Sequence, residues 1–291
     1  MAKEITIKEA KNILPKRPQE SNKATFGKIL NIAGSKFYQG AAYLSSVSAL
    51  KVGAGYLTLA CPDCILNNIV SKSSDITFLP LRSFKDESIA SDNAKMILET
   101  ALNYNAISLG CGLSTNSSTV EFVDKFLQGF NLDIPLVIDA DGLNAISQIG
   151  TKRLPQNTII TPHPKELSRL LDVEPEEIND NREYFAQFAS EKYKAIVVLK
   201  GNKTVIADYN KNVFINQTGN SALAKAGTGD VLTGIITGLL AQKIDLLNAA
   251  VLATFIHGLC GELASKEMTE YGVLASDLIN YIPKSLLKII N

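Results

Sequence analysis

The residues best suited to chemistry lie in Ala226–Gly234, where the turn Gly227-Thr228-Gly229 is followed directly by Asp230. Glycines let the backbone come close to a ligand. The amides of a helix's first turn have no partner in the helix, and with the helix dipole they form an anion site. The turn is therefore a candidate anion hole. Asp230 is a candidate catalytic base that deprotonates a hydroxyl attacking the bound phosphoryl group. Helix capping by Asp230 is the alternative.

Two further motifs place polar side chains directly after apolar segments. Asp139, Asp141 and Asn144 follow one segment, and His163 and Glu166 follow the next. Oxygens of the first group could hold Mg²⁺ through water or bind a ribose, although Asp141 could instead cap a helix. Prolines on both sides hold His163 in extended backbone, so we expect it to contact ligand rather than fill the core. Glu166 could touch metal-bound water or favour the start of a helix.

Three other segments could also contact a ligand. Gly34–Lys36 closes an apolar segment, and the small residues Ala41 and Ala42 follow it, which suggests a loop over a flat ligand or a tight turn. Gly110–Ser114 resembles a phosphate-binding turn, but its two glycines alone are weak evidence for a dinucleotide fold. The lysines of Lys200–Thr204 are candidates for nucleotide contacts, although exposed lysines are common.

The composition excludes several classes of protein. The 291 residues hold 29 Lys and Arg against 29 Asp and Glu, so no polybasic surface for nucleic acid or anionic lipid is expected. No apolar run reaches the roughly 18 residues that suggest a membrane span. The first residues lack the apolar stretch of a signal peptide, and the four cysteines are scattered. We therefore expect a cytoplasmic protein.

Short apolar segments alternate with helical patterns along the first two thirds of the chain. Strands are predicted at 28–33, 56–60, 76–79, 106–109, 136–140, 158–161 and 195–199, and helices at 41–52, 117–128, 141–148, 164–171 and 182–192. A hairpin at 203–208 and 212–216 precedes helices at 230–242, 246–266 and 274–290. This alternation predicts one α/β domain, residues 1–291, with a mainly parallel sheet. Ligands gather at the carboxyl ends of such strands, where these motifs fall.

Five motifs occur in an order that resembles the ADP/ATP-dependent NAD(P)H-hydrate dehydratases, members of the ribokinase-like superfamily. They are Gly34–Ser35, Asp139–Asn144, Thr161–Glu166, Leu199–Gly201 and Ala226–Gly234, and the resemblance spans roughly residues 25–285. It implies a three-layer α/β/α sandwich and a homotetramer. The chain is too short to include the epimerase domain fused to many bacterial relatives, so a separate epimerase partner is expected.

The resemblance also implies roles for single residues. Positions that line the hydrated dinucleotide site match Ala41 or Ala42, Gly112, His163 and Asp230. Positions that hold the adenine nucleotide match Lys200, Gly201, Asn202, Lys203, Thr204 and Gly229. Asp139 and Glu166 are the candidates to hold Mg²⁺ through water. The chain departs from the family pattern at Lys165, where Gly is frequent, and at Ser221–Ala222, where Pro-Gly is frequent.

The activity implied is that of an ADP-dependent (S)-NAD(P)H-hydrate dehydratase. ADP phosphorylates the hydroxyl of hydrated NADH or NADPH, and loss of phosphate regenerates NAD(P)H, with AMP and phosphate as products. ATP as the donor remains an alternative. Two other functions also stay open. One is an ATP-dependent vitamin-type hydroxyl kinase, similar to hydroxyethylthiazole kinase, and the other is a nucleotide-binding protein without turnover.

Overall fold

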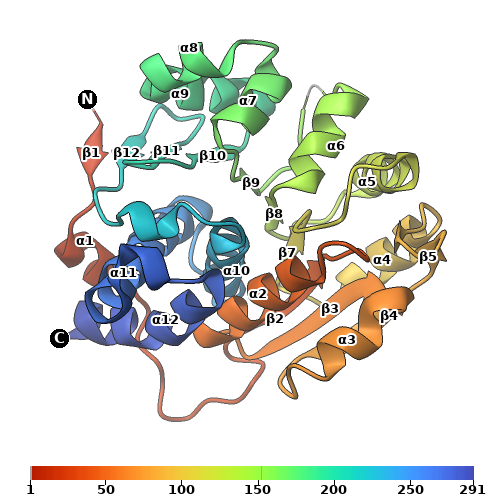
Figure 1. The fold of residues 1–291 in the computed structure, drawn as a ribbon, viewed down its shortest axis with the longest axis horizontal. Coiled ribbons are helices and arrows are strands. Elements are labelled where there is room, and N and C mark those ends of the chain that lie inside the picture. The colour runs from red at the N-terminus through yellow and green to blue at the C-terminus, as the bar shows by residue number, and fades with distance from the viewer. Residues whose placement is uncertain (1, 152) are drawn as a thin grey trace.

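The computed structural model describes residues 2–151 and 153–291, and a ten-stranded sheet runs through its centre (Figure 1). The strands are β1 (Lys3–Glu4), β2 (Lys28–Ile32), β3 (Tyr56–Pro62), β4 (Thr77–Leu81), β7 (Ala106–Leu109), β8 (Leu136–Ile138), β9 (Thr158–Ile160), β10 (Ile196–Leu199), β11 (Val205–Ala207) and β12 (Val213–Ile215). Their order is β1-β12-β11-β10-β9-β8-β7-β2-β3-β4. Strand β11 is antiparallel to both neighbours, and all other pairings within this sheet, among the residues that the structure describes, are parallel.

Helices cover both faces of this sheet (Figure 1). One face carries α1 (Ile7–Ile13), α2 (Gln39–Lys51), α3 (Leu66–Val70), α10 (Thr228–Ala241), α11 (Leu246–Gly272) and α12 (Ala275–Ile290). The other carries α4 (Asn93–Ala101), α5 (Ser117–Gly129), α6 (Asp141–Ile149), α7 (Pro164–Leu171), α8 (Pro175–Asp180) and α9 (Arg182–Tyr193). Each face has its own hydrophobic core, because the central strands are apolar on both sides. The predicted three-layer α/β/α sandwich is confirmed.

The structure also contains elements that the sequence patterns did not predict. Helices α1, α3, α4 and α8, the small antiparallel pair β5 (Ser83–Phe84) and β6 (Ser88–Ile89), and strand β1 are all short. Strand β1 pairs with β12, the second strand of the predicted hairpin. Two residues cannot show a period of alternation, so only the partner strand makes this segment a strand.

Helix α11 qualifies the expectation that no segment could span a membrane. By length and composition alone it is apolar enough to cross one. However, 67% of its most apolar window is buried inside the fold, where it packs against α10 and α12. The apolar side chains of α11 therefore form part of the hydrophobic core on that face of the sheet.

Candidate active site

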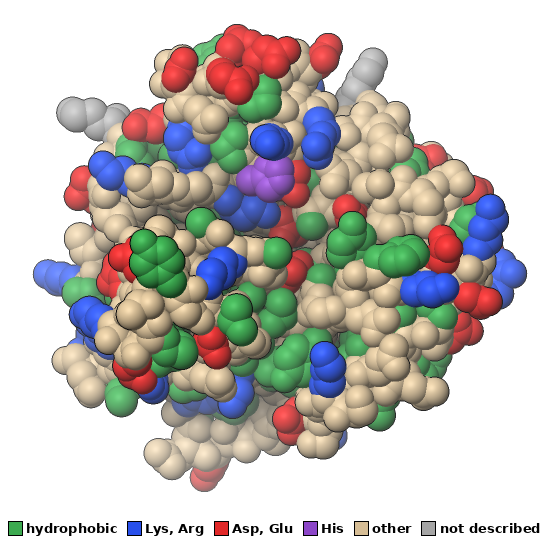
Figure 2. Space-filling view, viewed as in Figure 1, with side chains coloured by type: hydrophobic (Ala, Val, Ile, Leu, Met, Phe, Trp, Pro, Cys, Tyr) green, Lys and Arg blue, Asp and Glu red, His purple; other side chains and the backbone are tan. Residues whose placement is uncertain are grey.

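The motif residues meet at the carboxyl edge of the central strands. Cys111 follows β7, Asp139 follows β8 and Lys200 follows β10, while Asp230 lies in the first turn of α10. The molecular surface is hollowed in this region, and a histidine there is surrounded by basic and acidic side chains (Figure 2). The parallel topology thus brings together residues that are far apart in the sequence.

Asp230 does not cap helix α10. The helix begins at Thr228, and its N-cap is Gly227, which has a φ of 91° and makes no side-chain capping bond. A φ of this sign favours glycine, which explains why glycine stands before the helix. Asp230 is therefore the third helical residue, and its carboxylate is left for another role.

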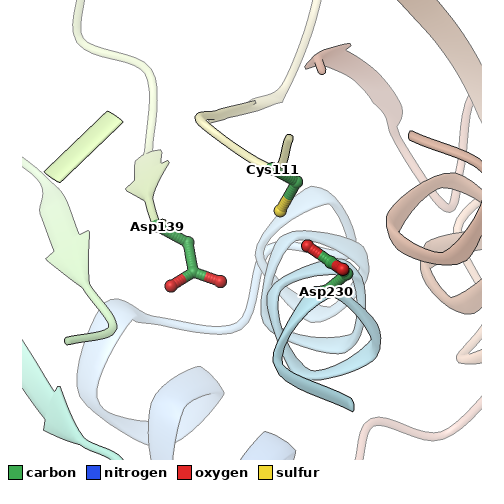
Figure 3. A group of neighbouring side chains, drawn as sticks. All are labelled: Cys111, Asp139 and Asp230. Atoms are coloured by element: carbon green, nitrogen blue, oxygen red, sulfur yellow. The ribbon is translucent and has the colours of Figure 1, made fainter. Parts of the chain in front are cut away.

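The carboxylate of Asp230 points toward Cys111 and Asp139 (Figure 3). One ligand-type atom from each of the three side chains lies within 4.8 Å of the other two. Burial raises the pKa of Asp230 to about 7, and the charge of Asp139 adds to this shift. Burial also raises the pKa of Cys111, so its thiol is protonated at neutral pH. Asp230 can therefore exchange a proton near pH 7, as a general base requires.

Lys200 supplies the positive charge at the site. Its Nζ lies 2.6 Å from Oδ1 of Asp139 and 3.6 Å from Oε2 of Glu166. Burial alone would lower the pKa of Lys200, but the two carboxylates outweigh this effect and raise it. A Cβ built on Gly229 would lie 3.6 Å from the same Nζ. The ammonium group is therefore beside the turn Gly227–Gly229, the candidate anion hole, which we call the anion turn. The arrangement can stabilise negative charge that develops there.

The carboxylates of Asp139 and Glu166 are hard oxygen donors of the kind that Mg²⁺ prefers. Their oxygens already accept hydrogen bonds, from Lys200 Nζ and Thr233 Oγ1 for Asp139 and from the His163 amide for Glu166. Lys200 also stands between them. The residues fit a metal ion held through water and nucleotide oxygens, and they do not form a cage of direct protein ligands.

Two backbone amides in the first turn of α10 are donors without a partner in the helix. Gly229 and Asp230 are the second and third residues of α10, so their amides have no partner within the helix. The amide of Thr228 instead contacts the carbonyl oxygen of Lys225 at 3.4 Å, and its Oγ1 donates to the carbonyl oxygen of Leu223 at 2.8 Å. Thr228 thus shapes the turn, while Gly229 and Asp230 supply the donors.

A cavity of about 780 Å³ opens on one side of the turn. All the residues predicted to hold a nucleotide line it, namely Lys200, Gly201, Asn202, Lys203, Thr204 and Gly229. Its far wall is formed by the segment after β12 and by α11. A cavity of this size is typical of small-molecule sites. Asp230 is not one of the residues that line this cavity, and its carboxylate points toward Cys111 (Figure 3).

Gly112 and Ala41, two of the predicted substrate contacts, lie side by side. A Cβ on Gly112 would be 2.8 Å from the Cβ of Ala41. Ala42 is fully buried, and its Cβ lies near Gly34. Between the two alanines, Ala41 is therefore the one that can face a substrate.

Asp141 ties the Gly112 turn to helix α6. Its Oδ2 accepts a hydrogen bond from the Ser114 amide at 2.8 Å, and its Oδ1 accepts one from Asn144. The N-cap of α6 is Ala140, with an unusual φ of 47°, so Asp141 does not cap the helix. The strained backbone at Ala140 lets the two flanking carboxylates bind different partners. Asp139 accepts a hydrogen bond from Lys200, and Asp141 accepts one from the Ser114 amide.

His163 has both a structural role and access to the cavity. Its Nδ1 accepts a hydrogen bond from the Glu166 amide at 3.1 Å, which caps helix α7, while Glu166 Oε2 accepts from the His163 amide at 2.7 Å. The ring is half exposed and lines the cavity. Burial lowers the pKa of His163 to about 4, so the ring is neutral near pH 7. The sequence predicts that His163 contacts ligand and does not have a structural role. The structure shows that His163 also caps helix α7.

Sequence comparison places the chain among known proteins. The model of the NAD(P)H-hydrate dehydratase family matches residues 29–284. The ADP-dependent (S)-NAD(P)H-hydrate dehydratase of Bacillus subtilis is 34% identical over 281 residues, which cover 96% of each chain. The bifunctional NAD(P)H-hydrate repair enzyme of Moorella thermoacetica is also 34% identical, over 96% of this chain. The chain spans about half of that enzyme, 53% of its length.

Solved structures agree with this placement. A dehydratase from Bacillus subtilis, crystallised with ATP and Mg²⁺, matches with a TM-score of 0.86, 32% identity and 99% coverage of both chains. A ribokinase-like superfamily protein from Enterococcus faecalis matches with a TM-score of 0.87 and 24% identity, over 99% of this chain and 96% of that one. The ribokinase-like fold is thus confirmed, and the chain belongs to the NAD(P)H-hydrate dehydratase family.

Proposed function

We propose that the protein is an ADP-dependent (S)-NAD(P)H-hydrate dehydratase. The observation that carries this proposal is the position of Asp230, a carboxylate with a pKa near neutrality at the start of a helix whose free amides border a nucleotide-sized cavity. A site that only bound phosphate would gain nothing from a carboxylate there, since the two negative charges repel. Asp230 is useful only if it takes a proton.

In the first step, Asp230 accepts the proton of the hydrate hydroxyl as that oxygen attacks the terminal phosphorus of ADP. The bond between this phosphorus and the bridging oxygen breaks, and AMP leaves. The amides of Gly229 and Asp230 and the ammonium group of Lys200 stabilise the negative charge on the transferring group.

In the second step, the carbon–oxygen bond of the phosphorylated ring breaks and phosphate departs with the electron pair. The ring nitrogen donates electrons to the carbon that loses phosphate. Water or the departing phosphate takes a proton from the adjacent carbon, and this restores the conjugated dihydropyridine. Hydroxide is a poor leaving group and phosphate is a good one, which explains why the reaction consumes a nucleotide.

Mg²⁺ would be held through water by Asp139 and Glu166, and it would neutralise charge on the nucleotide phosphates. One solved relative was crystallised with ATP and Mg²⁺. Asp139 would also keep Lys200 beside the turn, through its contact of 2.6 Å. The choice of ADP over ATP, a separate epimerase partner and a tetrameric assembly stay predictions.

Counting products tests the function directly. The protein is incubated with hydrated NADH, Mg²⁺ and either ADP or ATP, and NADH, nucleotide product and free phosphate are measured. The proposal expects one AMP and one phosphate for each NADH formed with ADP. A vitamin-type kinase acts on a simple alcohol, in which no ring nitrogen donates electrons to the carbon that carries the phosphate, so the phosphate stays attached. A stable phosphorylated product, or no NADH with either nucleotide, would overturn the proposal.

The pH dependence of the reaction follows from the raised pKa of Asp230. The base works only when it is ionised, so kcat/KM should rise with pH and level off above about 7. An ordinary aspartate would give a profile already flat at pH 5. The measurement is kcat/KM between pH 5 and 9 at constant ionic strength, and a flat profile over the whole range would argue against Asp230 as the base.

Variants of His163 can separate substrate contact from helix capping. Asparagine is a favoured N-cap but lacks the ring, so His163→Asn should keep the melting temperature and raise KM for the hydrated dinucleotide about tenfold. His163→Ala should raise KM similarly and also destabilise the protein by about 1 kcal/mol. If His163→Asn leaves KM unchanged, the residue is a cap and does not contact the substrate.

A further inference from the structure

Helix α11 contributes a side chain to the anion turn that the mechanism above does not use. His257 lines the cavity, and its Nε2 lies 2.9 Å from the carbonyl oxygen of Thr228. A carbonyl oxygen can only accept a hydrogen bond, so Nε2 carries the proton and donates it. Burial lowers the pKa of His257 to about 4, which keeps the ring neutral near pH 7. His257 therefore ties α11 to the first residue of α10.

The carbonyl group that His257 contacts shares a peptide unit with a catalytic donor. The C=O of Thr228 and the N–H of Gly229 belong to the same planar peptide group and point in opposite directions. The helix already directs this oxygen toward the Leu232 amide, so His257 is a second donor that holds the same peptide group, and with it the Gly229 N–H, from outside the helix. A hydrogen bond to the oxygen also polarises the peptide group and strengthens its N–H as a donor.

The part of α11 that carries His257 is firmly seated against the cavity wall. A Cβ on Gly258 would lie 2.0 Å from Oγ1 of Thr218, so only glycine allows this close approach. Thr218 Oγ1 donates to the carbonyl oxygen of Phe255 at 3.2 Å, and Asn216 Nδ2 donates to that of Thr254 at 3.0 Å. The imidazole is thus presented to the turn from a rigid support.

We propose that His257 is a positioning residue for phosphoryl transfer, which directs the Gly229 N–H toward the terminal phosphoryl group by holding the Thr228 carbonyl. This inference rests on the proposed function, which places that phosphoryl group at the turn. In this role His257 acts through the Thr228–Gly229 peptide group and not through contact with the phosphorus or the attacking hydroxyl. Its loss should weaken contacts to the terminal phosphoryl group and leave those to the rest of the nucleotide unchanged.

Three substitutions test this role. The amide nitrogen of glutamine reaches about as far as Nε2, so His257→Gln keeps a donor for the Thr228 carbonyl, whereas His257→Leu fills similar space without one. His257→Asn has a donor that is too short. Leu and Asn should lower kcat about tenfold or more, and Gln should stay within about threefold of wild type, since net hydrogen-bond energies and small misplacements have effects of this size.

Binding of ADP and AMP, measured by calorimetry without the dinucleotide, adds a readout that loss of packing would not reproduce. AMP lacks the terminal phosphoryl group, so His257→Leu should weaken ADP binding about tenfold and leave AMP binding within about twofold. Thr254→Val is the matched control, since Thr254 lines the same cavity one turn earlier on α11 and should affect both nucleotides alike.

The outcomes distinguish this inference from the proposed function. Equal losses in His257→Gln and His257→Leu, equal losses for ADP and AMP, or wild-type behaviour in all three variants would each overturn the positioning role. A wild-type protein that binds ADP but forms no NADH would instead overturn the dehydratase function. In that case the comparison of ADP with AMP would still decide whether His257 orients the turn.

Discussion

Asp230→Asn should lower kcat by about 10²- to 10⁴-fold, the loss expected when a general base is removed. The amide has the size and shape of the carboxylate but cannot accept a proton at neutral pH. The backbone amides of Gly229 and Asp230 remain, so the dissociation constant for ADP should change by less than about threefold. The measurements are steady-state kinetics with hydrated NADH, and calorimetry with ADP.

The stability of the same variant provides an independent check. The pKa of Asp230 is raised to about 7 in the folded protein, mainly by burial, so its ionised form costs stability as pH rises through 7. Below the ordinary aspartate pKa the group is protonated in both states and the cost vanishes. Asp230→Asn should therefore melt at the same or a higher temperature than wild type at pH 8.

A matched control is available at another helix start. Asp245 caps α11 by accepting a hydrogen bond from the Asn248 amide at 3.0 Å, and it lies outside the site. Asparagine is an equally good cap, so Asp245→Asn should leave kcat and stability unchanged. If Asp230→Asn behaved in the same way, Asp230 would have only a structural role in α10.

Much of the fold could be predicted from the sequence because its strands are continuous apolar segments buried on both faces. Strand β7 and helix α7 have the predicted bounds, Ala106–Leu109 and Pro164–Leu171. The carboxyl ends of parallel strands share one edge of a sheet, so the convergence of Asp139 with Lys200 also followed from the pattern. The start of α10 was misplaced by two residues, since a left-handed glycine cap leaves no polar N-cap signal.

Other parts of the site depend on contacts between distant segments, and no local pattern records these. The sequence places Cys111 in a glycine turn and among four scattered cysteines, and neither pattern predicts that its thiol lies within 4.8 Å of a carboxylate of the site. His257 lies in the apolar half of a long helix, where its position along the sequence gives no indication of its partner. The ion pair of Lys200 likewise joins residues 61 positions apart. Burial and hydrogen bonds had to be measured to find these roles.

Lys200→Met should lower kcat/KM by about 10²- to 10³-fold, the effect of removing one preorganised stabiliser of transition-state charge. The variant should also be less stable. Methionine keeps the length of the side chain but leaves Asp139 and Glu166 without their shared cation, and breaking a buried ion pair costs about 3–5 kcal/mol. Thermal unfolding and steady-state kinetics with hydrated NADH and ADP measure the two effects.

A second substitution can separate these two effects. Glu166→Gln still accepts the hydrogen bond from the His163 amide, so it preserves the cap of α7 while removing one negative charge. The double variant Lys200→Met/Glu166→Gln should regain much of the lost stability, because fewer charges are left unpaired. Its kcat/KM should stay as low as that of Lys200→Met and below that of Glu166→Gln alone, since the ammonium group beside Gly229 is gone.

Lys203 offers a control for loss of positive charge alone. It is exposed and lines the same cavity three positions later, without a resolved ion pair among the described residues. Lys203→Met should raise KM for ADP by a few-fold at most and leave kcat and the melting temperature unchanged, because an exposed cation is screened by solvent. If the double variant recovered activity together with stability, Lys200 would serve only to balance the two carboxylates. Activity that stays low in a stable double variant, and well below that of Glu166→Gln alone, would instead assign the ammonium group to the transferring phosphoryl group at the Gly229 amide.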